Sequence, residues 1–315
     1  STNWKKDGAH FATYFFGATA EKWVDMTDAD GDGIYEAANP KTNLSVKICC
    51  LKSGKTETKW ENVKWRSINY EIPTGVENCW VVNDEAEDDA TGIWTVLIGE
   101  SDNSTTLSAA NSQTVNTLVN RQFESEKLYT ISLPFALDAE QVETIFGAGT
   151  TIYEFAQLAK EGKELVLYFS TPSAIAAATP YLIQPTQDVT KGFIVEDATI
   201  SSTPNNISFT VDKTTITMEA ILSVEANAKT NGKYWLAGDK YLYNNENDLP
   251  ALRALFNVST KSGMPPRARV ALGENAATGL DNITNGENTT IKVIENGQPI
   301  IIRNAEKFNA QGVRL

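Results

Sequence analysis

Histidine is almost absent from this sequence, and positive charge is scarce. The chain of 315 residues contains a single histidine, His10, which excludes a mechanism or metal site that needs two imidazoles. Lysine and arginine together number 27 against 40 aspartates and glutamates, for a formal net charge of -13. Because an acidic surface repels phosphate, we expect no nucleic acid and no anionic lipid among the main partners. No apolar run reaches the roughly 18 to 20 residues that cross a bilayer, so we also expect no membrane span.

Cysteine is scarce as well. The three cysteines, Cys49, Cys50 and Cys79, are too few and too close for a tetrahedral zinc site, which normally needs four spaced donors. Neighbouring side chains on a strand point to opposite faces, so at most one of the first two thiols can meet Cys79. Such a disulfide stays open from the sequence, and we favour three buried thiols that act as small hydrophobic side chains.

Tryptophan is unevenly distributed along the chain. Six of the seven tryptophans lie in the first hundred residues, and the break in composition marks a boundary. The segment Ile98–Val115 is polar, small and weakly patterned, which is typical of a linker. We therefore predict a first β-sandwich over 1–98, a linker over 99–117, a second β-sandwich over 118–281 and a C-terminal β-meander over 282–315.

Short alternating apolar runs bounded by turn residues predict an all-β protein. In the first module these runs include His10–Phe16, Val46–Leu51 and Ile93–Ile98, and no segment is long enough for a helix. The second sandwich, which we expect to be of jelly-roll kind, has one predicted helix. That helix is capped by Asp138, with Gln141 at its third position and Gly147 at its end.

The second module resembles a β-sandwich that recurs near the C-termini of secreted and surface proteins of gut anaerobes of the Bacteroidales type. The stretches that carry the resemblance are Ser132–Gly147, Thr179–Val189, Tyr234–Tyr243 and Leu249–Val258. The last residues, IKVIENGQPIIIRNAEKFNAQGVRL, resemble the short terminal segments that close many such proteins. The resemblance implies a location outside the cytoplasm, secreted or at the cell surface, and it brings no catalytic activity.

The first module is similar to small starch-binding sandwiches of carbohydrate-binding family 26. The shared features are an opening strand with Tyr14 and Phe16, a tryptophan before a hairpin (Trp23), and an Asp-Gly hairpin tip. Where those modules often carry a Gln-Thr pair on a later strand, this chain has Arg66 and Ser67. The resemblance implies a polysaccharide ligand.

Exposed aromatic rings are the candidate binding residues, because sugars stack their apolar faces on flat rings while polar groups take the hydroxyls. Trp60 follows a polar stretch and is expected on a loop or strand edge, where burial is harder. We predict a binding surface of Tyr14, Trp23, Trp60 and Trp65, with His10, Asn62 and Arg66 as polar helpers. The alternative is that these rings fill the small core.

The segment DADGDG matches the first half of a calcium-binding loop, with acidic residues at alternate positions and glycine at the sixth. Its candidate ligands are Asp28, Asp30, Asp32, the Ile34 carbonyl and Glu36. The twelfth position holds Asn39 in place of glutamate, and strands are predicted on both sides. We favour a polar hairpin tip with no cofactor, and calcium is the alternative.

We expect a non-catalytic protein. No Gly-rich phosphate loop, zinc-protease helix or serine-nucleophile elbow occurs in the sequence. The many carboxylates leave a glycosidase-like pair open, but neither predicted sandwich offers the deep cleft that such chemistry uses. A polysaccharide is the leading partner, and adhesion to a surface protein or self-association is the alternative.

Overall fold

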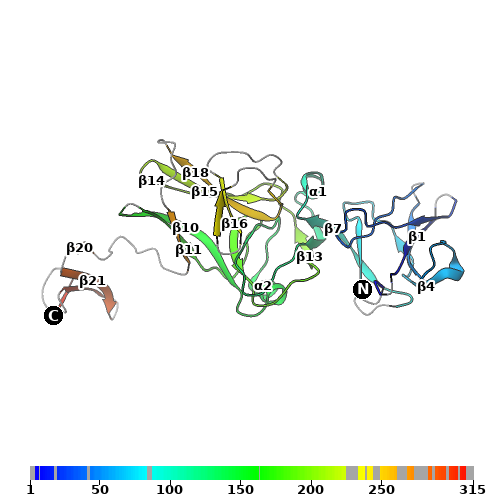
Figure 1. The fold of residues 1–315 in the computed structure, drawn as a ribbon, viewed down its shortest axis with the longest axis horizontal. Helices are drawn as coiled ribbons and strands as arrows, with labels where there is room; N and C mark the ends of the chain where they lie inside the picture. The colour runs from blue at the N-terminus through cyan, green and yellow to red at the C-terminus, as the bar shows by residue number, and fades with distance from the viewer. Residues whose placement is uncertain are drawn as a thin grey trace.

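A computed structural model describes residues 4–6, 8–17, 20–40, 43–83, 87–162, 164–224, 233–237, 240–243, 249–260, 268–272, 283–285, 288–295, 298–303 and 306–309. In this part of the chain strands dominate and only two short α-helices occur, which confirms the all-β prediction (Figure 1). Neither helix is long and apolar enough to span a membrane.

The first sheet carries the opening strands of the chain in the order β2-β1-β3-β4, and β5 pairs with β3. Its strands are β1 (Phe11–Phe16), β2 (Lys22–Asp25), β3 (Ser45–Leu51), β4 (Val63–Arg66) and β5 (Tyr70–Glu71). Side chains alternate between the two faces along a strand. Phe11 and Phe15 therefore enter the core, while Tyr14 and Phe16 lie on the opposite face, which we call the outer face.

The inner face of this sheet packs against a tryptophan-rich hairpin. The hairpin pairs β6 (Cys79–Val82) with the first half of β7 (Gly92–Gly99), and Trp80 and Trp94 pack on the core. A side chain at Gly92 would meet the Val81 carbonyl oxygen at 2.2 Å, so only glycine fits there. These contacts close a small aromatic core, which also buries Trp4.

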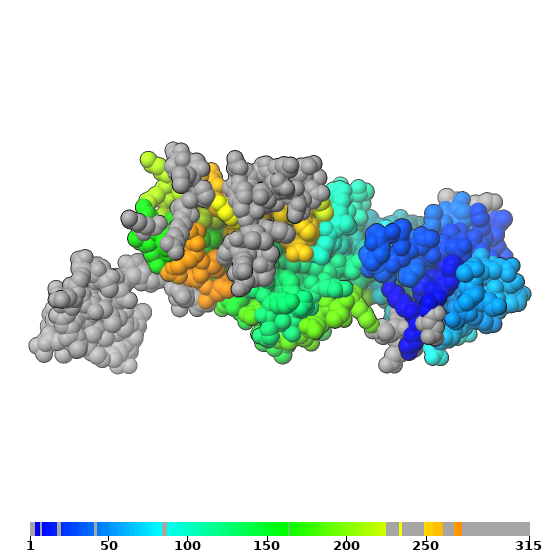
Figure 2. Space-filling view, in the orientation of Figure 1, coloured from blue at the N-terminus to red at the C-terminus, as the bar shows by residue number. Residues whose placement is uncertain are grey.

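Strand β7 belongs to both halves of the molecule. Its residues Gly92–Thr95 pair with β6, and its residues Val96–Gly99 pair in parallel with β8 (Thr114–Asn120). Strand β8 also pairs with β13 (Phe193–Thr199), so one sheet of order β13-β8-β7-β6 runs across the boundary. The first module (blue) and the second (green) adjoin in Figure 2.

The segment predicted as a linker, 99–117, forms regular structure. It contains α1 (Ser104–Ala110) and the first half of β8, and α1 is the crossover between the parallel strands β7 and β8. Leu107 and Ala110 are buried in the same core as Ile98 and Val115. The small polar residues that suggested a loop lie on the exposed side of this helix.

The second module is a sandwich of two further sheets. One has the order β19-β11-β10-β12-β9, with β9 (Tyr129–Ile131), β10 (Thr151–Glu161), β11 (Glu164–Ser170), β12 (Tyr181–Gln184) and β19 (Ala268–Leu272). The other has the order β14-β15-β18-β16-β17, with β14 (Ile207–Val211), β15 (Thr214–Ile221), β16 (Lys233–Ala237), β17 (Lys240–Tyr243) and β18 (Arg253–Thr260). Phe155 contacts Phe209 and Phe256 at ring distances of 4.9 and 6.4 Å, which joins the two sheets.

Helix α2 (Ala139–Phe146) begins and ends where the sequence predicts. The Asp138 carboxylate accepts the Gln141 backbone N–H, and the Gln141 side chain accepts the Asp138 N–H, which together form a capping box. Gly147 follows with a positive φ, and a side chain there would meet Thr186. Val142 and Phe146 face the core.

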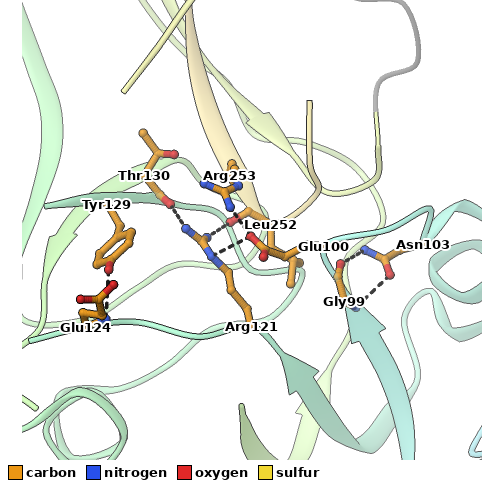
Figure 3. Close-up of polar contacts among 9 residues, drawn as sticks. All are labelled: Gly99, Glu100, Asn103, Arg121, Glu124, Tyr129, Thr130, Leu252 and Arg253. Carbon is orange, nitrogen blue, oxygen red and sulfur yellow. Dashed lines mark hydrogen bonds and ion pairs between the residues drawn. The ribbon is translucent and has the colours of Figure 1, made fainter. Parts of the chain in front are cut away.

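A buried arginine joins three segments of the second module (Figure 3). Arg121 is 2% exposed and donates hydrogen bonds to the backbone carbonyls of Leu252 and Thr130. Its Nε lies 3.4 Å from the carboxylate of Glu100, which also pairs with Arg253 at 2.5 Å. Burial, with a smaller contribution from Arg253, lowers the pKa of Arg121 to about 9, so the guanidinium stays charged at neutral pH.

The last four strands form a sheet of their own, as the predicted meander requires. They are β20 (Ile283–Asn285), β21 (Asn288–Glu295), β22 (Gln298–Arg303) and β23 (Glu306–Asn309), paired antiparallel in chain order. Their pairing places β21 and β22 at the centre of the sheet.

Candidate functional site

The outer face of the first sheet gathers aromatic side chains. Tyr14 on β1 lies between Trp23 on β2 and Lys47 on β3 in the strand register. Residues directly opposite each other in antiparallel strands project to the same face. Trp23, Tyr14 and Lys47 therefore form one row across the outer face.

Four rings form what we call the aromatic cluster: Tyr14, Phe16, Trp23 and Trp60. The Trp60 ring lies 4.8 Å from Tyr14 and 4.7 Å from Trp23, with its plane steeply tilted to both. Tyr14 and Trp23 are 5.0 Å apart, and Phe16 stacks on Tyr14 at 5.8 Å. Edge-to-face contacts of this kind fix the orientation of each ring.

Trp60 is the exposed member of the cluster. It opens the 3-10 helix η1 (Trp60–Asn62) in the connection between β3 and β4, and it is 41% exposed. Asn62 is buried, and its side chain donates to the Glu57 carbonyl at 2.9 Å. Lys52 donates its backbone N–H to the Asn62 carbonyl at 2.8 Å and its ammonium to the Glu61 carbonyl at 2.7 Å. These bonds hold the loop that carries Trp60.

Polar side chains lie around the aromatic cluster on the same sheet. His10 Nε2 lies 3.2 Å from a carboxylate oxygen of Asp25, and Asp25 is paired in the register with Ala12 on β1. The Tyr14 hydroxyl donates to the Glu21 carboxylate, and this bond, with burial as a smaller cause, raises the pKa of Tyr14 to about 12.

The predicted surface is only partly assembled. Tyr14, Trp23 and Trp60 come together, and His10 lies just before the start of β1, where it contacts Asp25. Trp65 pairs with the inward-facing Cys50 and packs on the aromatic core, with the Lys64 ammonium 3.8 Å from its ring centroid. Trp65 therefore does not join the aromatic cluster.

Two predicted helpers have structural partners. Asn62 supports the Trp60 loop from within, as described above. Arg66 is opposite Cys49 in the register, and its Nε lies 3.5 and 3.7 Å from Asp88 and Asp89. Phe16 and Lys47 were missed by the sequence prediction. Their signal was strand parity, because each shares the outer face with Tyr14.

The three thiols are free. Cys49 and Cys50 are buried and Cys79 is half-buried, so the predicted alternative of a disulfide to Cys79 is not formed. Burial raises the pKa of Cys49 to about 12 and that of Cys50 to about 11. The positive charges of Lys47 and Arg66 act in the opposite sense on the pKa of Cys49, and the negative charge of Asp88 adds to the effect of burial.

The acidic hairpin loop brings three carboxylates together. One oxygen each of Asp28, Asp30 and Asp32 lies within 4.8 Å of the others. Gly31 and Gly33 have φ of 75° and 85°, which glycine adopts without strain. Oδ1 of Asp28 is buried and has no hydrogen-bond partner, while its Oδ2 accepts the Gly33 N–H at 3.1 Å. These three carboxylates are the residues that could hold a hard cation.

The other residues of the candidate calcium loop make hydrogen bonds that stabilise the hairpin turn. The Ile34 N–H donates to the Asp32 carboxylate at 2.8 Å, and Glu36 pairs with Thr27 through the backbone. The Asn39 side-chain amide donates to the Asn43 carbonyl and accepts the Asn43 backbone N–H. The described geometry is that of a hairpin tip in which the second half of a calcium loop is not formed.

Comparison with models of known families, with curated proteins and with solved structures found no match for this chain.

Proposed function

We propose that the first module is a non-catalytic carbohydrate-binding module and that its outer face binds a polysaccharide through the aromatic cluster. The observation that carries the proposal is the position of Trp60. Its ring is 41% exposed, yet Tyr14 and Trp23 hold it at ring distances of 4.8 and 4.7 Å. A ring that is both exposed and fixed can stack on a sugar without first being ordered, which lowers the entropic cost of binding.

The polar side chains on the same face suit hydroxyl recognition. His10 directly precedes β1 and lies four positions before Tyr14, which corresponds to about 13 Å at the rise of an extended strand. A sugar chain stacked on Trp60 and running along β1 would reach the pair of His10 and Asp25 beyond its first ring. Imidazole and carboxylate groups supply the donors and acceptors that hydroxyls need.

The experiment is a titration of the intact chain with soluble polysaccharides, followed by tryptophan fluorescence and by affinity electrophoresis. Trp60→Ala should weaken binding about tenfold or more, since stacking on an aromatic ring is worth about 1 to 2 kcal/mol. Leu44→Ala removes another exposed apolar side chain, 61% exposed, and should leave binding unchanged. A panel without any binding, or equal affinity for the wild type and Trp60→Ala, would refute the proposal.

A protein partner is the second candidate, and one observation favours it. The large apolar side chains that are exposed in the described part of the chain are Leu44, Trp60 and Ile68, and all three belong to the first module. Because the exposed large apolar side chains are confined to the first module, that module is the place where a protein partner would make contact. Self-association would appear as a sedimentation coefficient that rises with concentration and falls to the monomer value in Ile68→Asp.

Location outside the cytoplasm, secreted or at the cell surface, belongs to the same proposal. Its support is the sequence resemblance of the second module and of the terminal segment to those of exported proteins. Protease treatment of intact cells that express the chain tests it, because an exported surface protein is cleaved while a cytoplasmic marker survives.

A further inference from the structure

The strands and loop that carry Trp60 are basic, although the chain as a whole is acidic. Residues 45–66 contain six lysines and arginines and two glutamates, within a protein of net charge -13. Of the two glutamates, Glu57 already pairs with Lys59 at 2.6 Å. This segment therefore carries an excess of four positive charges, and such an excess attracts anions over short distances even on an acidic protein.

Lys47 differs from the other cations of this face. Among the residues that the structure describes, its side chain has neither an ion pair nor a hydrogen bond, and the residue is half-buried beside Tyr14. His10 has Asp25, and Arg66 has Asp88 and Asp89. Glu21, which directly precedes β2, accepts the hydrogen bond of the Tyr14 hydroxyl.

A half-buried ammonium without a counter-charge loses part of its hydration and gains little in return. An anion that docks beside Tyr14 would supply the missing partner and would keep the other ion pairs intact. Lys47 is opposite Tyr14 in the register and Arg66 is opposite Cys49, so the two cations lie on different rows of the outer face, and Arg66 already has Asp88 and Asp89 as partners.

We infer that the ligand of the outer face is an anionic saccharide, whose carboxylate or sulfate pairs with Lys47 while a neighbouring sugar ring stacks on Trp60. This inference rests on the proposed function and narrows it from polysaccharides in general to acidic ones. The anion and the stacked ring belong to adjacent parts of one sugar chain, because Lys47 and Trp60 both lie beside Tyr14.

The test compares three tetrasaccharides built on galactose, one neutral, one sulfated and one carboxylated (galacturonate), by calorimetric titration of the intact chain. The two charged probes should bind more tightly than the neutral one, and their affinity should fall as sodium chloride is raised. Lys47→Gln should weaken binding of the charged probes about three- to tenfold, which is typical of one partly exposed ion pair. Lys191→Gln, which removes an exposed lysine from the second module, is the matched control.

The outcomes separate this inference from the proposed function. Equal affinity for neutral and charged probes, with loss in Trp60→Ala and no change in Lys47→Gln, would overturn the anionic preference and leave carbohydrate binding standing. The absence of binding to all three probes and to the polysaccharide panel would overturn both. Better binding of the sulfated or of the carboxylated probe identifies which anion the site accepts.

Discussion

Replacing the buried Arg121 with methionine tests how the second module is held together. Methionine keeps an unbranched apolar stem against Phe123, whose ring centroid lies 4.5 Å from the guanidinium carbon. It removes the hydrogen bonds to the Leu252 and Thr130 carbonyls, of which the Leu252 carbonyl keeps the Ser132 N–H as a donor. Glu100 is 38% exposed and keeps Arg253 as a partner, so its charge is not stranded.

The expected loss follows from the two carbonyls. A hydrogen bond from a charged donor contributes about 1.5 to 3 kcal/mol, so the loss of two in Arg121→Met should lower the free energy of unfolding by about 3 to 5 kcal/mol. For a domain of this size that corresponds to a fall in the melting temperature of about 10 °C. The pair of Arg269 and Glu161, 2.7 Å apart and more than 40% exposed on both sides, provides the control. Arg269→Met should cost less than about 1 kcal/mol.

Differential scanning calorimetry of the two variants and the wild type measures the difference, with far-ultraviolet circular dichroism to check that the variants fold. A melting temperature of Arg121→Met that equals that of Arg269→Met would refute the reasoning, since it would mean that water or a shifted side chain replaces both lost donors.

Two further predictions concern ionisable groups of the first module. The native chain should not react with a thiol reagent at pH 8, and three thiols should react in urea, because burial raises the pKa of Cys49 to about 12, of Cys50 to about 11, and also that of Cys79. As these thiols ionise in the unfolded chain first, the free energy of unfolding should fall as the pH rises from about 9 towards 12; a thiol that reacts at once in the native protein would contradict the burial. Asp30→Asn should stabilise the protein in a chelator by up to about 1 kcal/mol, because it removes one of three carboxylates within 4.8 Å, and a lower melting temperature would show that Asp30 makes a contact the turn needs.

Local signals in the sequence were enough to predict some elements. Helix α2 was predictable because the cap at Asp138, its partner Gln141 and the terminal Gly147 all lie within ten residues. Helix α1 was not predictable, because contacts with segments distant in sequence fix the position at which it begins. The Asn103 side chain bonds to the Gly99 backbone and to the Leu222 carbonyl, which lies 119 residues away in sequence.

In the candidate site too, some residue positions follow from local sequence signals and others depend on contacts between distant segments. The pairing of Tyr14 with Trp23 follows from strand parity across one hairpin and could be predicted. The position of Trp60 depends on the path of the loop between β3 and β4, which parity does not define. Trp65 was assigned to the surface because it is close to Trp60 in sequence, and only the register that pairs it with Cys50 shows that it faces inward.

The strand shared by the two modules has a mechanical consequence. A ligand fixed to an immobile matrix would pull on the first sheet, and the load would pass to the rest of the molecule through β7. Its bonds to β6 and β8 are loaded in shear, so many of them must break together before the modules separate. We therefore expect the junction to withstand a higher pulling force than a flexible linker would before the two modules move apart.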